Sequence, residues 1–132
     1  MKRTLAVALT FAGAAATIAV AASPAQAAPA QCPYRSFCVY NNQHYRNGVW
    51  STPNNDNDWS DNLFSNRSDN VANHDSSWFN NGSAASPSFV RVYDRPGRTG
   101  GVTICLAHGT GFESKPASVS DHGESHEWAN GC

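Results

Sequence analysis

The residues of this 132-residue chain best suited to covalent chemistry are its four cysteines, Cys32, Cys38, Cys105 and Cys132. An even number of cysteines in an exported chain is typical of disulfides, and four cysteines allow three pairings. The spacing favours Cys32 with Cys38, which closes a short loop, and Cys105 with Cys132, which ties a central segment to the C-terminus. Oxidised sulfurs cannot act as thiolate nucleophiles, and the C-x-x-C spacing of many zinc sites is missing. The cysteines therefore predict a cross-linked scaffold.

Two histidines, His122 and His126, have Glu124 between them and so contain the residue types of a zinc site. Metalloprotease motifs place the glutamate directly after the first histidine, on a helix. Gly123 occupies that position here and disfavours a helix, and His108 could join the pair only through the fold. The sequence also lacks the Gly-x-Ser-x-Gly motif of many serine hydrolases. We therefore expect loop histidines in solvent and a protein that is not an enzyme.

The segment 105–111 has the composition of a rigid binding loop. Cys105 supplies a covalent anchor, Leu106 an apolar side chain directly after it, and Ala107 and His108 lead into small residues. An inhibitor of proteases needs an extended segment that fills a cleft, and rigidity removes the ordering cost of binding. The alternative is that Leu106 is a core residue at a strand end and that Cys105 is purely structural. The residues alone leave both interpretations open.

The element that must position this segment is a hairpin over residues 89–106. Its first arm alternates, with Phe89, Arg91 and Tyr93 on one side and Val90 and Val92 on the other, as in a strand. Residues 94–101 are dense in glycine and proline and predict a broad, arched connection. Residues 102–106 form the returning strand.

Other short β-rich runs occur at residues 37–40, 49–51 and 77–80 and, less clearly, at 127–130. Asn, Asp, Ser and Gly interrupt the chain too often for an amphipathic helix. Regularly spaced short strands with turn signals between them predict an all-β sandwich.

The chain also resembles itself at an offset of about 50 residues. The run that ends at Tyr40 is similar to the run that ends at Tyr93, and the run around Trp78 is similar to the run around Trp128. We expect two repeats, at about residues 32–82 and 88–132, that form a Greek-key sandwich face to face. Trp78 and Trp128 then have paired core roles.

The first residues of the chain have the pattern of a secretory signal peptide. Lys2 and Arg3 precede an apolar run, Pro24 breaks it, and Ala-Gln-Ala at 25–27 fits a cleavage site. A membrane anchor is the alternative, but no charged stop-transfer segment follows the run. We expect removal of residues 1–27, secretion to the extracellular space, and a single domain over residues 28–132 with no membrane contact.

Composition excludes one class of partner. The formal net charge is −1, and loss of Lys2 and Arg3 with the signal peptide makes the mature chain more acidic. No basic stripe interleaves with aromatic residues, so we expect no binding to nucleic acid. We expect a monomer. Trp50 and Trp59 flank a polar segment, which suggests that they are exposed.

A tyrosine, an aromatic residue five positions later and a glycine two after that resemble the Greek-key motif of βγ-crystallins. Asparagine is a common substitute for that glycine, because it tolerates positive φ. In the first copy the residues that fit are Tyr40, Tyr45 and Asn47, followed later by the serine pair Ser76-Ser77. In the second copy Tyr93 and Gly100 fit. The second copy departs from the motif at two positions, because Arg98 replaces the aromatic residue and Glu127 replaces the serine pair.

The chain more specifically resembles peptidase inhibitor family thirty-six. The resemblance lies in the run from Cys32-Pro33 through Cys38-Val39-Tyr40 and in the strands at 89–93 and 102–106. Members of this family are small exported bacterial proteins, and the prototype inhibits metalloproteinases. The resemblance implies an extracellular protease as partner and a reactive bond near Cys105–Leu106. A prototype-like loop closes with a second nearby cysteine, whereas the next one here is Cys132.

The resemblance to βγ-crystallins also implies an alternative function. Many of them bind calcium through two Asn/Asp residues, a spacer of two and then Ser/Thr-Ser. Asp61, Asn62 and Ser65 fit this order, although Asn66 replaces the last serine. The chain would then be a calcium-binding structural or cell-envelope module without inhibitory activity. The competing interpretation is that these side chains stabilise turns. No other cofactor is expected.

Overall fold

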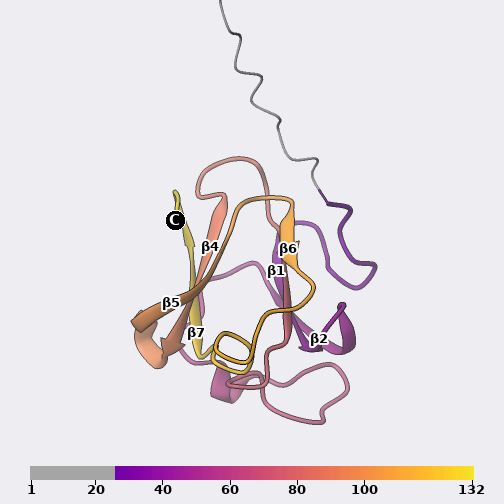
Figure 1. The fold of residues 1–132 in the computed structure, drawn as a ribbon. Coiled ribbons are helices and arrows are strands. Elements are labelled where there is room, and N and C mark those ends of the chain that lie inside the picture. The colour runs from indigo at the N-terminus through magenta and orange to yellow at the C-terminus, as the bar shows by residue number, and fades with distance from the viewer. Residues whose placement is uncertain (1–25) are drawn as a thin grey trace, which may run out of the picture.

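The structure, a computed structural model, describes residues 26–132; the signal peptide predicted for residues 1–27 lies outside them except for its last two residues. Within residues 26–132, seven strands form two sheets that pack face to face, without an α-helix (Figure 1). The all-β prediction is confirmed. None of the described segments forms a helix of the length and apolarity that crossing a bilayer requires. The elements are β1 (Ser36–Asn42), β2 (Arg46–Thr52), the 3-10 helix η1 (Trp59–Asp61), β3 (Ser77–Asn81), β4 (Phe89–Arg95), the 3-10 helix η2 (Pro96–Arg98), β5 (Thr99–Leu106), β6 (Thr110–Phe112) and β7 (Ser125–Ala129).

The strand order interlocks the two halves of the chain. The first sheet has the order β2-β1-β3-β6 and the second the order β5-β4-β7. β6 comes from the second half, yet it pairs with β3, with Phe112 opposite Trp78. In the other direction, Asp56 from the first half forms a bridge with His126 in β7. Because each sheet takes a piece from the other half, the two Greek-key units cannot separate without breaking both sheets.

The hairpin of β1 and β2 turns through an arch that a serine holds. The Ser77 hydroxyl donates to the Asn42 carbonyl (2.7 Å) and accepts from the Tyr45 N–H (3.0 Å). Tyr45 and Asn47 have φ of 57° and 59°, in the left-handed region that asparagine tolerates. The Tyr40 and Tyr45 rings lie 5.2 Å apart between centroids. The residues of the crystallin-like motif thus form one corner.

The hairpin of β4 and β5 has the same arch. The Ser125 hydroxyl donates to the Arg95 carbonyl (2.6 Å) and accepts from the Arg98 N–H (3.0 Å). Arg98 and Gly100 have φ of 58° and 75°. The repeat alignment that placed Glu127 opposite the serine of the first half is therefore wrong, because Ser125 makes the equivalent hydrogen bonds.

One apolar core fills the space between the sheets. Alternate residues of β1 and β4 point into it, and Phe37, Val39, Val90 and Val92 are all 0% exposed. Burial of each such side chain stabilises the fold by about 1.5–3 kcal/mol. Other buried members of the core are Trp59, Phe64, Val71, Trp78, Ile104 and Leu106.

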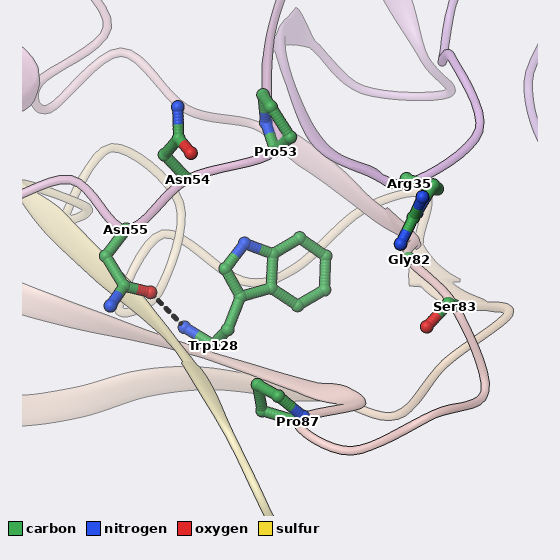
Figure 2. A pocket seen from close by; sticks show the side chains of 8 residues that line it. All are labelled: Arg35, Pro53, Asn54, Asn55, Gly82, Ser83, Pro87 and Trp128. Atoms are coloured by element: carbon green, nitrogen blue, oxygen red, sulfur yellow. Dashed lines mark hydrogen bonds between the residues drawn. The ribbon is translucent and has the colours of Figure 1, made fainter.

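Two tryptophans lie elsewhere than the sequence suggested. Trp59 is 0% exposed, and its Nε1 donates to Nδ1 of His126 at 2.9 Å, so the exposure suggested by its polar neighbours is wrong. The paired core role holds for Trp78, which is 0% exposed, but not for Trp128. Trp128 is only partly buried, and it lines a pocket at the edge of the sandwich (Figure 2).

Two disulfides join Cys32 to Cys38 and Cys105 to Cys132, with 5.8 Å between the Cα atoms of each pair. These are the pairs that the spacing favours. The first ties the segment before β1 to that strand, and the second ties β5 to the C-terminus. The second bond spans a sequence separation of 27, and the chain-entropy model gives such a loop a stabilisation of about 3–4 kcal/mol.

Candidate functional site

One end of the sandwich gathers the ends of both sheets and the C-terminus (Figure 1). β5 finishes there, and residues 107–109 turn into β6. The segment 82–88, which follows β3, lies at the same end. The residues proposed as a binding loop therefore meet a second, unrelated loop.

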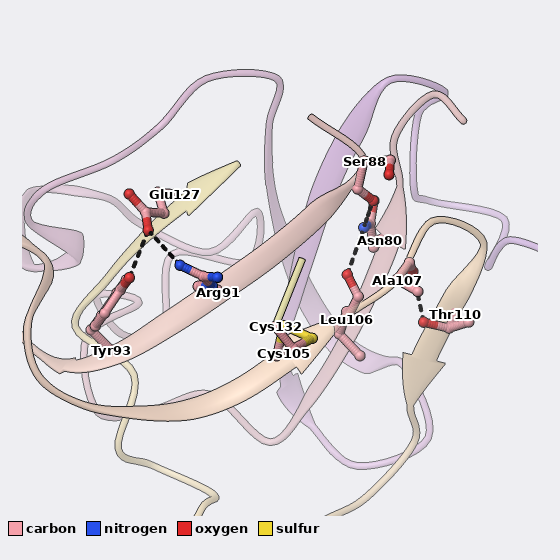
Figure 3. Close-up of a disulfide and its surroundings, with 10 residues drawn as sticks. All are labelled: Asn80, Ser88, Arg91, Tyr93, Cys105, Leu106, Ala107, Thr110, Glu127 and Cys132. Atoms are coloured by element: carbon pink, nitrogen blue, oxygen red, sulfur yellow. Dashed lines mark hydrogen bonds and ion pairs between the residues drawn. A yellow bond between two sulfur atoms is a disulfide. The ribbon is translucent and has the colours of Figure 1, made fainter. Parts of the chain in front are cut away.

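Asn80, a buried residue of β3, joins these loops. Its Nδ2 donates to the carbonyls of Leu106 and Ser88, each at 3.0 Å, as Figure 3 shows. Its Oδ1 accepts from the Gly82 N–H at 2.9 Å, and its backbone carbonyl accepts from the Gly109 N–H at 2.9 Å. A single side chain and its own backbone thus fix the end of β5, the turn and the start of β4. Sequence reasoning used Asn80 only as a repeat position.

Leu106 points into the core and is only 2% exposed. Of the two roles that the sequence left open for its side chain, the structure shows burial at a strand end. The accessible part of the predicted loop is the next two residues, with Ala107 partly buried and His108 exposed. The Ala107 carbonyl accepts from the Thr110 hydroxyl at 2.7 Å (Figure 3). The turn therefore presents His108 on a fixed backbone.

The orientation of the His108 ring follows from one hydrogen bond. Its Nδ1 lies 2.7 Å from the Gly82 carbonyl oxygen. A carbonyl oxygen only accepts, so Nδ1 carries the hydrogen. In the neutral ring the lone pair is then on Nε2, for which residues 26–132 provide no hydrogen-bond partner. A histidine that ligates a metal is commonly held in this way, by a carbonyl behind the other nitrogen.

The Cys105–Cys132 disulfide lies on the outer face of the second sheet, near a polar cluster (Figure 3). The Tyr93 hydroxyl donates to Oε1 of Glu127 at 2.6 Å, and Nη1 of Arg91 lies 3.7 Å from the same oxygen. The hydrogen bond to Glu127 raises the pKa of Tyr93. Nη1 of Arg98 lies 3.8 Å from the other oxygen of Glu127, so a single carboxylate holds two guanidinium groups and a phenol against the sheet. The cluster therefore serves to stabilise the second sheet and its arch.

The pocket around Trp128 has a volume of about 360 Å³ and opens beside the same loops (Figure 2). The Gly82 backbone separates it from His108: a Cβ on Gly82 would lie 2.5 Å from Cζ3 of Trp128, while the Gly82 carbonyl accepts from the histidine. Sequence reasoning missed this pocket because its parts are far apart in the chain. It is lined by Arg35, Pro53, Asn54, Asn55, Gly82, Ser83, Pro87 and Trp128.

The predicted calcium ligands lie at the opposite end of the sandwich, around η1. The Asn62 amide donates to Oδ1 of Asp61 at 2.8 Å and to Oδ2 of Asp56 at 3.0 Å. The Ser65 hydroxyl accepts from the Val49 N–H at 3.1 Å. These contacts fit the alternative that the side chains stabilise turns. Calcium binding at Asp61, Asn62 and Ser65 stays a prediction.

The histidine pair considered for zinc is not arranged as one site. His122 is exposed, whereas His126 is 0% exposed in the core. Nδ1 of His126 accepts from Trp59, and its Nε2 donates to the Asn54 carbonyl at 2.9 Å. Burial lowers the pKa of His126 to about 4. In the part of the chain that the structure describes, no three His, Cys, Asp or Glu side chains come together as metal ligands.

Asp75 is a buried carboxyl that sequence reasoning did not single out. Its two oxygens accept from the Gly123 N–H at 2.9 Å and from Nε1 of Trp78 at 2.8 Å. Burial raises the pKa of Asp75 to about 7, although the hydrogen bonds from Gly123 and Trp78 lower it. Asp75 therefore connects the start of β3 to the loop before β7 and is sensitive to pH.

Comparison with known proteins agrees with this architecture. The sequence model of peptidase inhibitor family I36 matches residues 25–105. The match includes the first disulfide and ends at Cys105, before the turn at residues 107–109. A search of curated proteins found no relative.

Among solved structures, the chain is similar to one from a study of the evolution of the eye-lens βγ-crystallin fold. Their TM-score is 0.57 at 12% identity, over 76% of this chain and 91% of that one. IPSE alpha-1, an IgE-binding crystallin, gives 0.54 at 14% identity over 74% and 85% of the chains. A βγ-crystallin from an archaeon gives 0.50 at 13% over 70% and 95%. At such identities the likeness shows the fold alone, which is that of βγ-crystallins.

Proposed function

The chain belongs to peptidase inhibitor family I36, and from that membership we propose that it is a secreted inhibitor of zinc metalloproteases that binds its target through the turn at His108. The two disulfides support an oxidising, extracellular location. Export by a signal peptide over residues 1–27 is part of the same proposal.

The observation that carries the proposal is the presentation of His108. Its ring stands exposed at one end of the sandwich, with Nδ1–H bound to the Gly82 carbonyl and the Nε2 lone pair free. The catalytic zinc of a protease keeps one position open for water or substrate. An imidazole nitrogen is a favourable zinc ligand. His108 could therefore occupy the position of the catalytic water and stop hydrolysis directly.

Rigidity of the turn supports inhibition rather than use as a substrate. Asn80 holds the carbonyl of Leu106 and, through its backbone, the amide of Gly109. The disulfide anchors Cys105 on one side, and β6 continues on the other. A segment that is already ordered loses little conformational entropy on binding. The backbone around Cys105 and Leu106 therefore stays in place, while Ala107 and His108 make the contact.

The test compares the unaltered mature chain with His108→Gln. Gln keeps a polar side chain but cannot offer the imidazole lone pair, so we expect the inhibition constant for thermolysin to rise at least about tenfold. His122→Gln is the matched control, because His122 is also exposed but lies before β7, at the opposite end. Thermal melts check that both variants fold like the parent.

A spectroscopic arm tests the role of zinc directly. Thermolysin with cobalt in place of zinc should change its visible absorption when the unaltered chain binds, because the ligand set of the metal changes. His108→Gln should abolish that change. Equal inhibition by both chains, or unchanged cobalt spectra in a complex that does inhibit, would refute direct ligation by His108.

A further inference from the structure

The pocket of Trp128 lies directly beside the proposed binding turn. The peptide of Gly82 contacts His108 on one side through its carbonyl and approaches the Trp128 ring on the other. A protease complex of ordinary size buries about 800 Å² on each partner. A protease that engages His108 must therefore also cover this pocket, which makes the pocket part of the same interface.

The pocket offers hydrogen-bond donors that lack acceptors. Within residues 26–132, the Arg35 guanidinium makes neither an ion pair nor a hydrogen bond, whereas Arg91 and Arg98 both lie near Glu127. Nε1 of Trp128 is shielded from solvent and has no hydrogen-bond partner in the described chain. A shielded N–H without an acceptor costs free energy, so it favours a ligand that supplies one.

The remaining polar groups point to the same kind of ligand. Oδ1 of Asn55 already accepts from the Trp128 backbone N–H at 2.7 Å, which leaves its NH₂ group as a donor. Figure 2 shows the indole in the middle of the pocket, with Asn54 and Asn55 on its nitrogen side and Arg35 near Gly82. No aspartate or glutamate is among the lining residues. An anionic acceptor with two oxygens suits such a set.

We propose that this pocket is a second anchor of the inhibitor and receives an acidic side chain, Asp or Glu, of the bound protease. The inference rests on the proposed function. Arginine and tryptophan are the residue types that most often dominate protein interfaces. A guanidinium binds a carboxylate through two parallel hydrogen bonds, which fixes the orientation of the partner. The pocket would thus select targets that carry a carboxylate beside the active-site cleft.

Charge reversal tests the anchor. Arg35→Glu should raise the inhibition constant for thermolysin at least about tenfold, because it places two carboxylates in one pocket. Arg67→Glu is the matched control: both arginines are exposed and have positive φ, 67° and 54°, but Arg67 follows η1 at the far end. The control should inhibit as the parent does. For the parent, inhibition should weaken with added salt more steeply than for Arg35→Gln.

Trp128→Phe separates binding from stability. The change removes Nε1, which has no partner in the free protein, together with the indole carbons Cζ3 and Cη2 that lie nearest to Gly82. The loss of a shielded unpaired donor offsets part of the lost packing, so we expect the melting temperature to change little. Inhibition should nevertheless weaken by about threefold or more, because the acceptor on the protease loses its partner. The indole N–H resonance of Trp128 should shift downfield in the complex of the parent.

The outcomes separate the two proposals. If the parent inhibits and Arg35→Glu inhibits equally well, the anchor is refuted and the role of His108 stands on its own test. If the parent does not inhibit thermolysin, both proposals fail. If Trp128→Phe inhibits as the parent does, the indole nitrogen makes no contact with the protease and the assigned pocket chemistry is wrong.

Discussion

Asn80 shows how one residue can control the candidate binding surface without contacting the target. Its amide nitrogen donates hydrogen bonds to the carbonyls of Leu106 and Ser88, and its amide oxygen accepts one from the Gly82 N–H. The residue itself is 0% exposed. A buried polar group of this kind stabilises only when every partner is satisfied, and here all three contacts converge on the loops that present His108 and Trp128.

We therefore predict that Asn80→Ala loosens this end of the molecule. The substitution leaves buried backbone groups without partners, and one such group costs about 1–3 kcal/mol. The free energy of unfolding should fall by at least about 2 kcal/mol in denaturant titrations. The inhibition constant should rise as well, because the turn is no longer pre-ordered.

Asn80→Asp should be at least as harmful, because a carboxylate oxygen would then face the carbonyls of Leu106 and Ser88. Asn42→Ala is the control, since Asn42 is an exposed strand residue for whose side chain the described structure shows no hydrogen bond. A stability of Asn80→Ala equal to that of Asn42→Ala would contradict the assigned role.

At the scale of the elements, the arch between β4 and β5 depends on Gly100. Its φ is 75°, and a Cβ there would lie 1.9 Å from Oδ1 of Asp94. That oxygen accepts from the Gly101 N–H at 2.7 Å, so it cannot move without breaking the arch. Gly100→Ala should therefore combine backbone strain with a steric clash and lower the free energy of unfolding by more than about 2 kcal/mol.

Gly97 provides the comparison within the same arch. It has a similar φ of 72°, but a Cβ there would meet nothing nearer than 3.9 Å. Gly97→Ala should therefore cost only the backbone strain, about 1 kcal/mol. The difference between the two variants, measured by thermal or chemical unfolding, gives the cost of the clash. Equal losses would show that the approach of Asp94 plays no part.

Much of the element layout could be predicted because it depends on local patterns. The alternation at residues 89–93 and the arched, glycine-rich connection indicate the β4–β5 hairpin, and cysteine spacing favours the observed disulfides. β6 was missed because it has three residues and its partner, β3, lies in the other half of the chain. Ser125 was missed because equivalence between the repeats is defined by hydrogen bonds, not by a constant offset.

The candidate site was predicted only in part, for a related reason. Position 108 lies two residues after the predicted strand 102–106, so the sequence could mark it as part of a loop. The burial of Leu106 could not be distinguished from exposure, because an apolar residue at a strand end suits both a core and a cleft. Nothing local brings Arg35 to Trp128, so the pocket emerges only from the packing of the two sheets.

For the whole molecule, two buried titratable groups act on stability in opposite directions. The pKa of His126 falls from 6.5 to about 4, so its contribution is complete above pH 6.5 and is lost as the pH falls toward 4. The pKa of Asp75 rises from 3.8 to about 7, so its contribution is present at low pH and is lost as the pH rises through 7. Between about pH 4 and 6.5 the two effects oppose each other.

Single substitutions should expose this compensation. His126→Gln keeps an acceptor and a donor for Trp59 and Asn54 but removes the titration, so stability should fall with rising pH between about 4.5 and 7. Asp75→Asn removes the other group, so stability should rise with pH over about 4.5 to 6.5. Each slope can reach about 1.4 kcal/mol per pH unit for one proton. The parent should show a flatter profile than either variant.

The measurement is the free energy of unfolding from denaturant titrations at a series of pH values. The exposed carboxyls are common to all three proteins. Their contribution therefore cancels when the free energy of unfolding of the parent is subtracted from that of a variant at the same pH. Asp121, which lies near Asp75, and Arg98, which lies near His126, are also unchanged in each comparison. Parallel profiles for the parent and both variants would mean that these two groups titrate alike in the folded and unfolded chain. Opposite slopes would show that the stability of the sandwich is balanced between a buried acid and a buried base across the mildly acidic range.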